Sequence, residues 1–275
     1  MNVAPIAEFL SERIGLDAAS LGLSTFHAAV VEQMRTLALT DANAYAARLA
    51  SCSDDLEGLL NRLLVPESWF FRGGELFPFL AREISASLQK DGERVFRILC
   101  LPCSTGEEPY SLAMALLARF PPEAGWQVEV AATDLSTKVL RAAQAALWPI
   151  EKADDIPVRH RKAFMLKGTG SQAGKMKAGP EIRSVVTFDR LNLNDDIYPV
   201  HGPFDFIFCR NVLIYFDLPS KTRVVARLLD HLAPGGCLFL GFAETATGIN
   251  DQLASVGPNV YARAERGAGV ELVRA

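Results

Sequence analysis

The sequence predicts an α/β protein in which a parallel sheet follows a small helical domain, and three observations lead to this fold. The first 64 residues show only amphipathic helical patterns, such as Ile6, Phe9, Leu10 and Ile14 on one face of the segment 4–15. From about residue 90, short apolar runs typical of buried strands alternate with helical patterns. The 275 residues, 49% hydrophobic and 22% charged, suffice for one large domain and one small domain.

The helical part contains further predicted helices before the sheet begins. One is predicted over 24–39 with Ser24 or Thr25 as its N-cap, and another pattern over 54–66 stops at Pro66. We therefore assign 1–64 to an N-terminal helical domain, 65–90 to an interdomain segment with a linker helix, and 91–275 to the α/β domain.

The α/β part shows a regular order of elements. Ser136 and Asp217 are predicted to cap the second and third of its helices. A glycine-rich stretch at 167–180 interrupts this alternation of strands and helices. A phosphate-binding loop is disfavoured, because no strand is predicted before the stretch and no helix after it. The remaining interpretations are an exposed loop between two elements and an insert that binds a partner. The predicted strands are 95–101, 126–134, 185–193, 204–212, 237–242 and 259–264, and the helices between them are 107–120, 137–146 and 219–232, the last followed by a turn at 234–236.

Composition excludes several classes of protein. The formal net charge of -4 and the pI near 5.7 argue against general nucleic-acid binding, which usually needs a basic excess. No apolar run reaches the roughly 20 residues of a membrane span, and the first residues lack the features of a signal peptide, so we expect a cytoplasmic protein without membrane insertion. The five cysteines fit reduced core thiols, and the four histidines lack the spacing of metal ligands.

Polar residues follow four of the predicted strands where each strand ends. Ligands of open α/β sheets bind at the carboxyl ends of the strands, near the point where strand order reverses. These residues should therefore gather along one edge of the sheet. They are Cys103 to Glu108, Asp134, Asn192, and Arg210 with Asn211.

The turn after the first strand indicates the charge of the ligand. It has one glycine, Gly106, and the next helix begins with Glu107 and Glu108, which would repel a pyrophosphate. Asp134, 28 residues after Gly106, lies where an acid commonly binds ribose hydroxyls. A cationic, phosphate-free adenosine ligand fits, which describes S-adenosylmethionine. Stabilisation of the helix dipole explains the two acids equally well when they are taken alone.

Two other features have alternative interpretations. Cys100 and Cys103 form a C-x-x-C, but Cys100 lies inside an apolar strand, which disfavours a redox centre. The aromatic residues of the segment 66–72 either pack the two domains together or anchor Arg72 over the cofactor.

The motifs taken together resemble one family. In order and spacing, "ESWFFR", "CSTGEEPYSLAM", "ATDLSTKVL", "FDFIFCRNVLIYFD" and "LAPGGCLFLGFAET" resemble the CheR-type methyltransferases, over residues 60–262. The resemblance implies a class I S-adenosylmethionine-dependent methyltransferase sheet, with a small β-subdomain insert at 165–188. It also implies transfer of a methyl group to glutamates of chemoreceptor cytoplasmic helices, and in some members docking of a receptor's C-terminal peptide. We expect a member from an alternative, surface-sensing pathway.

The resemblance also assigns roles to single residues. It places Arg72 and Tyr215 beside the reacting methyl group. Three departures stand out: Pro66 replaces a polar cofactor contact, Gly73 and Gly74 replace an acid, and the helical domain is acidic where the family is often arginine-rich. The residues matching the family's cofactor contacts are Ser68, Arg72, Glu108, Asp134, Asn192, Leu193, Arg210 and Asn211.

The reaction implied needs no general base. A glutamate with a pKa of about 4.3 is already ionised at neutral pH, so the enzyme must supply alignment and exclude water. Three alternatives remain at this stage: methylation of another protein or a small molecule, a cofactor-binding adaptor without turnover, and a nicotinamide-dependent oxidoreductase.

Overall fold

The computed structural model describes residues 2–64, 68–74, 76–80 and 95–263. Pro66 and most of the predicted linker segment 65–90 lie outside these residues. No helix in the described part of the chain is both long enough and apolar enough to cross a bilayer.

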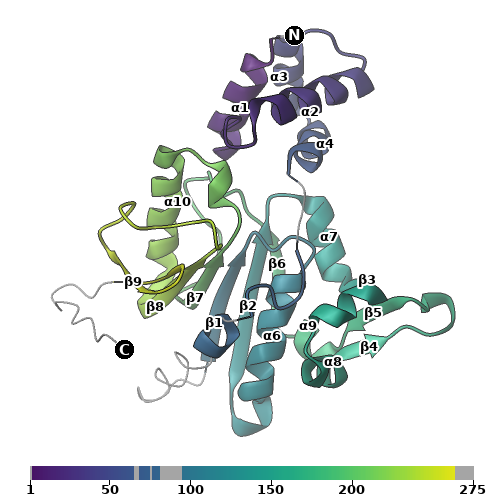
Figure 1. Cartoon of the computed structure of the whole chain (residues 1–275), viewed down its shortest axis with the longest axis vertical. Coiled ribbons are helices and arrows are strands. Elements are labelled where there is room, and N and C mark those ends of the chain that lie inside the picture. The colour runs from purple at the N-terminus through teal and green to yellow at the C-terminus, as the bar shows by residue number, and fades with distance from the viewer. Residues whose placement is uncertain (1, 65–67, 75, 81–94, 264–275) are drawn as a thin grey trace.

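Four helices form a bundle at the N-terminal end, at the top of Figure 1. They enclose their own apolar cluster, in which the side chains of Leu10, Phe26 and Tyr45 are almost wholly buried. The predicted N-cap of the second helix is wrong, because that helix begins after Gly22, whose positive φ of 82° ends the preceding turn. The helices are α1 (Ala4–Ile14), α2 (Leu23–Thr36), α3 (Ala42–Ser51) and α4 (Ser53–Leu63).

A seven-stranded sheet forms the centre of the α/β part, which confirms the predicted fold class. Its strand order is β6-β2-β1-β7-β8-β10-β9, with parallel pairing from β6 to β8 and antiparallel pairing of β10 with both neighbours. Strand β9 was not predicted, since its residues are exposed or half-buried and form no apolar run. The strands are β1 (Val95–Leu101), β2 (Gln127–Asp134), β6 (Val186–Arg190), β7 (Phe204–Cys209), β8 (Leu232–Leu240), β9 (Leu253–Gly257) and β10 (Val260–Arg263).

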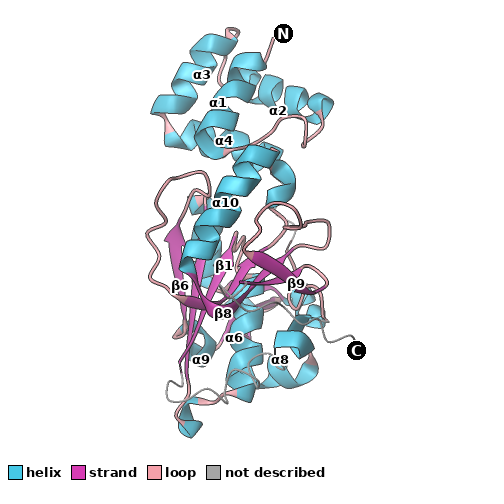
Figure 2. Ribbon diagram, turned by 90° about the vertical axis from the view of Figure 1, so that its left-hand side faces the viewer, coloured by secondary structure: helices cyan, strands magenta, loops and turns pink. Residues whose placement is uncertain are grey.

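Helices cover both faces of this sheet (Figure 2). Ile98 and Cys100 of β1 pack in a cluster with α6 (Glu107–Arg119), while Leu99 and Leu101 pack in a second cluster with α10 (Leu218–His231). This explains the continuous apolar run of β1. As predicted, the Asp217 side chain caps α10 by accepting the Ser220 N–H at 2.8 Å. Strand order reverses between β1 and β7, so their carboxyl ends border a crevice.

A second, three-stranded sheet projects from the side of the molecule beside α8 (Val158–Phe164), at the right of Figure 1. Its antiparallel order is β3-β5-β4, from β3 (Leu147–Pro149), β4 (Met165–Lys167) and β5 (Lys175–Ala178). The predicted insert at 165–188 contains β4, β5 and the short α9 (Pro180–Arg183); β3 precedes it, and β6 pairs with β2 in the large sheet. The glycine-rich stretch 167–180 begins at the end of β4, contains β5 and reaches the start of α9, so the expectation that it has no preceding strand and no following helix is wrong. Its glycine-rich part 168–174 nevertheless connects two antiparallel strands, which is not the setting of a phosphate loop.

The last turn of α1 docks on the loop that follows β6. The Asn192 amide donates to the Arg13 carbonyl oxygen at 3.0 Å, and the Asn194 amide donates to that of Glu12 at 2.8 Å. These bonds satisfy carbonyl groups that a helix end leaves without an intrahelical partner. Docking therefore uses main-chain atoms of α1.

The chain leaves α1 through Gly15, and this position tolerates no side chain. Its φ is +73°, and a Cβ there would lie 2.6 Å from the ring of Phe216. Leu16 then forms an isolated antiparallel bridge with Phe216. The glycine thus allows the bundle to approach the chain that follows β7.

We predict that Gly15→Ala lowers the free energy of unfolding by about 2–4 kcal/mol, from left-handed backbone strain and from crowding of Phe216. Gly22→Ala is the matched control, since Gly22 has a φ of +82° but only one atom nearby, at 3.9 Å. It should cost about 1 kcal/mol. Urea unfolding measures both, and equal losses would contradict the packing argument.

Candidate functional site

A cavity of about 540 Å³ lies between the bundle and the carboxyl edge of the large sheet. The bundle contributes Ser20, Leu21, Thr25 and Asn61 to its wall, residues for which the sequence held no signal. Of the predicted strand-end residues, Cys103, Thr105, Gly106 and Glu107 do not line this cavity. All the residues matched to the family's cofactor and methyl-group contacts do line it. These residues are Ser68, Arg72, Glu108, Asp134, Asn192, Leu193, Arg210, Asn211 and Tyr215.

The Asp134 carboxylate joins the ends of β1 and β2. It accepts the N–H of Ser104 at 2.9 Å and that of Ser136 at 3.0 Å. Gly106 permits the close turn between them, because a Cβ there would lie 3.1 Å from that of Ala143 in α7 (Thr137–Ala145). Burial raises the pKa of Asp134, and the backbone hydrogen bonds oppose that rise.

The predicted cap of α7 is only partly right. Ser136 occupies the N-cap position, but its side chain makes no capping hydrogen bond. Glu57 of α4 does this instead: its carboxylate accepts the Thr137 N–H at 3.2 Å and the Thr137 hydroxyl at 2.7 Å. A carboxylate at a helix N-terminus is favourable, so this contact also holds the bundle against the sheet.

The two acids that begin α6 have different environments. Glu107 is fully buried, forms an ion pair with Lys152 and accepts the Thr105 hydroxyl at 2.7 Å. It does not line the cavity. Glu108 does line it, and its carboxylate pairs with Arg210. Only the second acid is therefore placed to meet a ligand.

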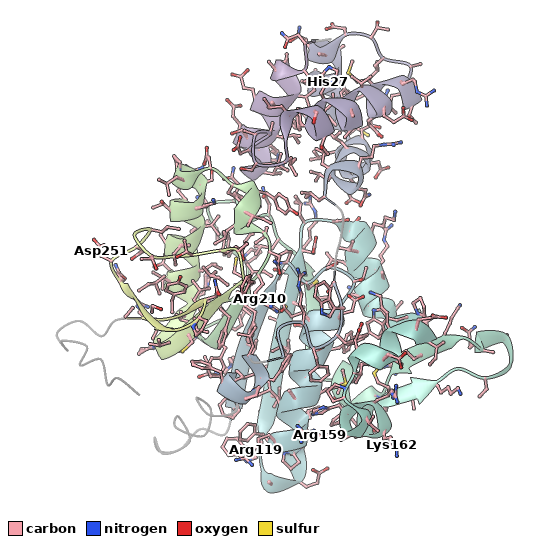
Figure 3. The ribbon with its side chains drawn as sticks, in the orientation of Figure 1. His27, Arg119, Arg159, Lys162, Arg210 and Asp251 are labelled. Carbon is pink, nitrogen blue, oxygen red and sulfur yellow. The ribbon has the colours of Figure 1, made fainter. Side chains whose placement is uncertain are left out.

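Arg210, labelled near the centre of Figure 3, connects three parts of the site. Its guanidinium pairs with Glu108 and donates to the Arg72 carbonyl oxygen at 3.2 Å. A Cβ on Gly73 would lie 3.0 Å from Arg210 Nη2. Glycine at position 73, one of the departures from the family pattern, thus allows the chain to pass close to this guanidinium.

In the segment 68–72, Phe70 and Phe71 pack in the apolar cluster of the α/β part, and the position of Arg72 over the cofactor stays a prediction. Phe70 is buried, and the N–H of Phe71 donates to the Ser111 hydroxyl at 2.9 Å, so these two residues fix the segment. Trp69 is 42% exposed, and the Arg72 guanidinium lies over its ring, 4.1 Å from the centroid. This cation–π contact holds Arg72 at the cavity wall.

Tyr215 ends the short 3-10 helix η4 (Leu213–Tyr215) after β7. Its carbonyl oxygen accepts the Asp17 N–H of the bundle at 2.8 Å. The bundle and the loop after β7 together fix its position.

The side-chain amide of Asn192 is occupied within the protein. Besides Arg13 it donates to Asp195 at 2.8 Å, and its oxygen accepts the Asn194 N–H at 3.1 Å. Any ligand contact of Asn192 would then use its main chain. Leu193 offers a mostly buried apolar side chain to the same wall.

Four buried polar atoms on the cavity wall have no hydrogen-bond partner: Ser104 Oγ, Thr133 Oγ1, Ser136 Oγ and Arg210 Nε. Buried polar groups are normally satisfied, so these atoms indicate a polar ligand. The wall also carries both signs of charge, which suits the amino-acid end of S-adenosylmethionine, while the hydroxyls suit its ribose. Arg210 and Ser104 belong to the predicted strand-end residues, and Ser136 was predicted only as a helix cap. Thr133, next to the end of β2, was not predicted.

The C-x-x-C pair shows the properties of core thiols. Cys100 and Cys103 are both buried, and burial raises the pKa of each thiol well above its usual value. A reactive thiol needs a lowered pKa and solvent access. The packing interpretation of this motif therefore stands, and the redox interpretation is disfavoured.

We predict that Lys152→Met lowers the free energy of unfolding by about 2–4 kcal/mol, because Glu107 would remain buried without its cation. Adding Glu107→Gln should recover part of the loss. Arg35→Met removes an exposed ion pair with Glu32 and should leave stability unchanged. Denaturant unfolding tests all three, and a Lys152→Met protein as stable as Arg35→Met would contradict the prediction.

Residues 66–262 match the family described as CheR methyltransferase, SAM binding domain. The chain is 40% identical over 241 residues to "Probable biofilm formation methyltransferase WspC" of Pseudomonas aeruginosa, covering 86% of this chain and 55% of that protein. It is 34% identical to chemotaxis protein methyltransferase 2 of the same organism, covering 94% and 91% of the two chains. Against the chemotaxis protein methyltransferase of Escherichia coli, identity is 33% with coverage of 94% and 88%. The chain thus spans about half of WspC and most of the other two, and it belongs to the CheR methyltransferase family, whose cofactor is S-adenosylmethionine.

Proposed function

We propose that this protein transfers the methyl group of S-adenosylmethionine to glutamate side chains in the cytoplasmic domain of a chemoreceptor. The products are γ-glutamyl methyl esters and S-adenosylhomocysteine. The main support is the single cavity at the strand switch point, where Arg72 and Tyr215 meet the acids and unpartnered hydroxyls suited to the cofactor. Relatives named as chemotaxis methyltransferases and WspC support a chemosensory role, and a surface-sensing pathway in particular.

The residues of the cavity divide into those that would hold the cofactor and those that would hold the substrate. Asp134 would bind the ribose hydroxyls, since its two oxygens have lone pairs beyond those used by Ser104 and Ser136. Glu108 would bind the ammonium group, and Arg210 would bind the carboxylate. Ser68 and Asn211 complete the polar wall.

Bound S-adenosylmethionine supplies a methyl group on a positive sulfur, whose departure with the bonding electron pair leaves a neutral thioether. The substrate glutamate is already ionised, so the protein needs only to align its oxygen with the methyl carbon and exclude water. We assign Arg72 and Tyr215 to this task through hydrogen bonds to the glutamate carboxylate. Stacking on Trp69 restricts the Arg72 guanidinium, which limits the entropy lost on binding.

The surface charge of the bundle bears on how the receptor docks. Residues 1–64 contain four arginines against eight acids. Arg48 pairs with Asp55, Arg35 pairs with Glu32, and Arg62 donates to the Gln33 amide oxygen at 2.6 Å. We propose that receptor helices dock here without the basic surface common in the family, and so with weak dependence on salt.

The small sheet is our proposed place for a receptor's C-terminal peptide. Leu147, Lys177 and Leu166 face one another in register, and both leucines and Lys177 are exposed. An apolar surface with a central lysine suits a short peptide that carries aromatic or aliphatic side chains and a carboxylate.

We predict that Arg72→Ala lowers kcat/KM for receptor methylation about 10²–10³-fold and that Tyr215→Phe lowers it about tenfold or more, since each loses a group that orients the nucleophile. The assay is transfer of labelled methyl groups to receptor cytoplasmic domains, with mapping of the modified glutamate. Arg119→Ala, whose side chain lies at the far end of α6 (Figure 3), should behave as wild type. Near-normal rates for both site variants would contradict the assigned roles.

The methyl-transfer assay, together with a calorimetric binding measurement, separates the remaining alternatives. Base-labile methyl esters on a receptor would exclude an adaptor without turnover. Label found only in another protein or a small molecule would replace the receptor as substrate. Calorimetric binding of NAD but not of S-adenosylhomocysteine would favour an oxidoreductase.

We predict that S-adenosylhomocysteine binding weakens as pH falls toward the raised pKa of Asp134, because burial makes this carboxyl take up its proton at a higher pH than an ordinary aspartate. The affinity should be full above that pKa and lost below it. Asp134→Asn should weaken binding about ten- to a hundredfold at neutral pH and remove this pH dependence. Calorimetry between pH 4.5 and 8 on both proteins tests the assignment; an unchanged pH profile in the variant would contradict it.

A further inference from the structure

A buried carboxylate follows β8 at the same edge of the sheet, outside the set of residues predicted from the sequence. Glu244 is only 5% exposed and does not line the cavity. It follows the strand after β7, whereas the polar residues predicted for the site follow the four earlier strands of the large sheet.

Both oxygens of Glu244 accept two backbone N–H groups each. Oε2 accepts those of Gly241 at 2.6 Å and Asn211 at 2.8 Å. Oε1 accepts those of Val212 at 2.8 Å and Ile214 at 3.3 Å. A carboxylate offers about four lone-pair sites, so its accepting capacity is used in full.

The loop after β7 needs such an acceptor because of its backbone shape. Asn211 has a φ of +60°, and η4 follows at once, so successive N–H groups turn toward one point. Gly241 makes room for the carboxylate: a Cβ there would lie 2.5 Å from Glu244 Oε2 and 2.8 Å from the Asn211 nitrogen. The space between Gly241, the Glu244 carboxylate and the Asn211 backbone is therefore too small for a side chain at position 241.

We propose that Glu244 is a positioning residue for methyl transfer, holding the 210–215 loop so that Asn211 and Tyr215 face the cavity. The inference rests on the proposed function. Three of the four N–H donors lie in this loop, and Asn211 and Tyr215 line the cavity, so the carboxylate acts on the reacting end through the backbone. A glutamine here would present an amide donor to N–H groups that need an acceptor.

Glu244→Gln should lower kcat for receptor methylation about 100-fold, since small displacements of orienting groups have effects of this size. The KM for S-adenosylmethionine should change less than tenfold even though Asn211 moves, because Asp134 and Glu108 lie outside the loop and Arg210 is held by its ion pair with Glu108. Asp205→Asn is the matched control: that carboxylate accepts the backbone N–H of Arg97 at 2.9 Å, at the opposite end of β7, and its loss should leave kcat within threefold.

Two further variants test the positioning role of Glu244 if Glu244→Gln fails to fold. Gly241→Ala displaces the carboxylate without removing it, and Glu244→Asp keeps the charge but shortens its reach; both should lower kcat at least tenfold. In a double-mutant cycle, Glu244→Asp with Tyr215→Phe should lose less than the product of the single losses, which a purely structural role would not produce.

Normal kcat in the folded Glu244 and Gly241 variants, or fully multiplicative losses in the cycle, would overturn the inference. A wild-type protein that forms no methyl ester on any receptor would instead overturn the proposed function. If Tyr215→Phe alone behaves as wild type, the catalytic assignment of Tyr215 fails, and with it this role of Glu244.

Discussion

Carboxylates that accept backbone N–H groups hold together the carboxyl edge of the sheet, and the site depends on them. The loops that leave parallel strands lose their ladder partners, so their N–H groups need other acceptors. Asp134 joins the ends of β1 and β2, Glu244 joins those of β7 and β8, and Glu57 joins α4 to the start of α7. Charge-assisted hydrogen bonds of this kind are stronger than neutral ones, which suits loops that must keep side chains in fixed positions.

This use of acids changes what the charge of the site means. Glu107 and Glu108 together suggest a negative pocket, but Glu107 serves Lys152 and Thr105 away from the cavity, and Glu108 faces Arg210. The wall therefore carries charges of both signs. Such a wall complements the ammonium and carboxylate of an amino acid more closely than it complements a simple cation. The expected cofactor was inferred from two acids, of which only Glu108 lines the cavity.

The predictable part of this protein is the part governed by periodicity and strand ends. Apolar runs located the central strands, and the strand-end rule collected residues that line one cavity. The hydrogen-bond partners of individual side chains were not predictable. The residues around Asn192 do not indicate that it bonds to Arg13, and those around Glu57 do not indicate that it caps a helix 80 residues away. Edge elements such as β9 lack a two-sided apolar pattern because one or both of their faces meet solvent. Glu244 follows the same strand-end rule and could have been found by extending it to the next strand.

The manner in which the bundle docks explains how its surface can differ from the family pattern. Along α1 and the residues after it, the contacts with the sheet domain use main-chain atoms: the carbonyl oxygens of Glu12 and Arg13, and the Asp17 N–H that bonds to Tyr215. Main-chain atoms are the same whatever the side chain. These contacts of α1 do not depend on the charge of its side chains, so the charge of that surface can change without disturbing them. Glu57 is an exception among the acids of the bundle, because its side chain caps α7. Docking of the bundle on the sheet domain and the charge of the bundle surface thus depend largely on different atoms of the same helices.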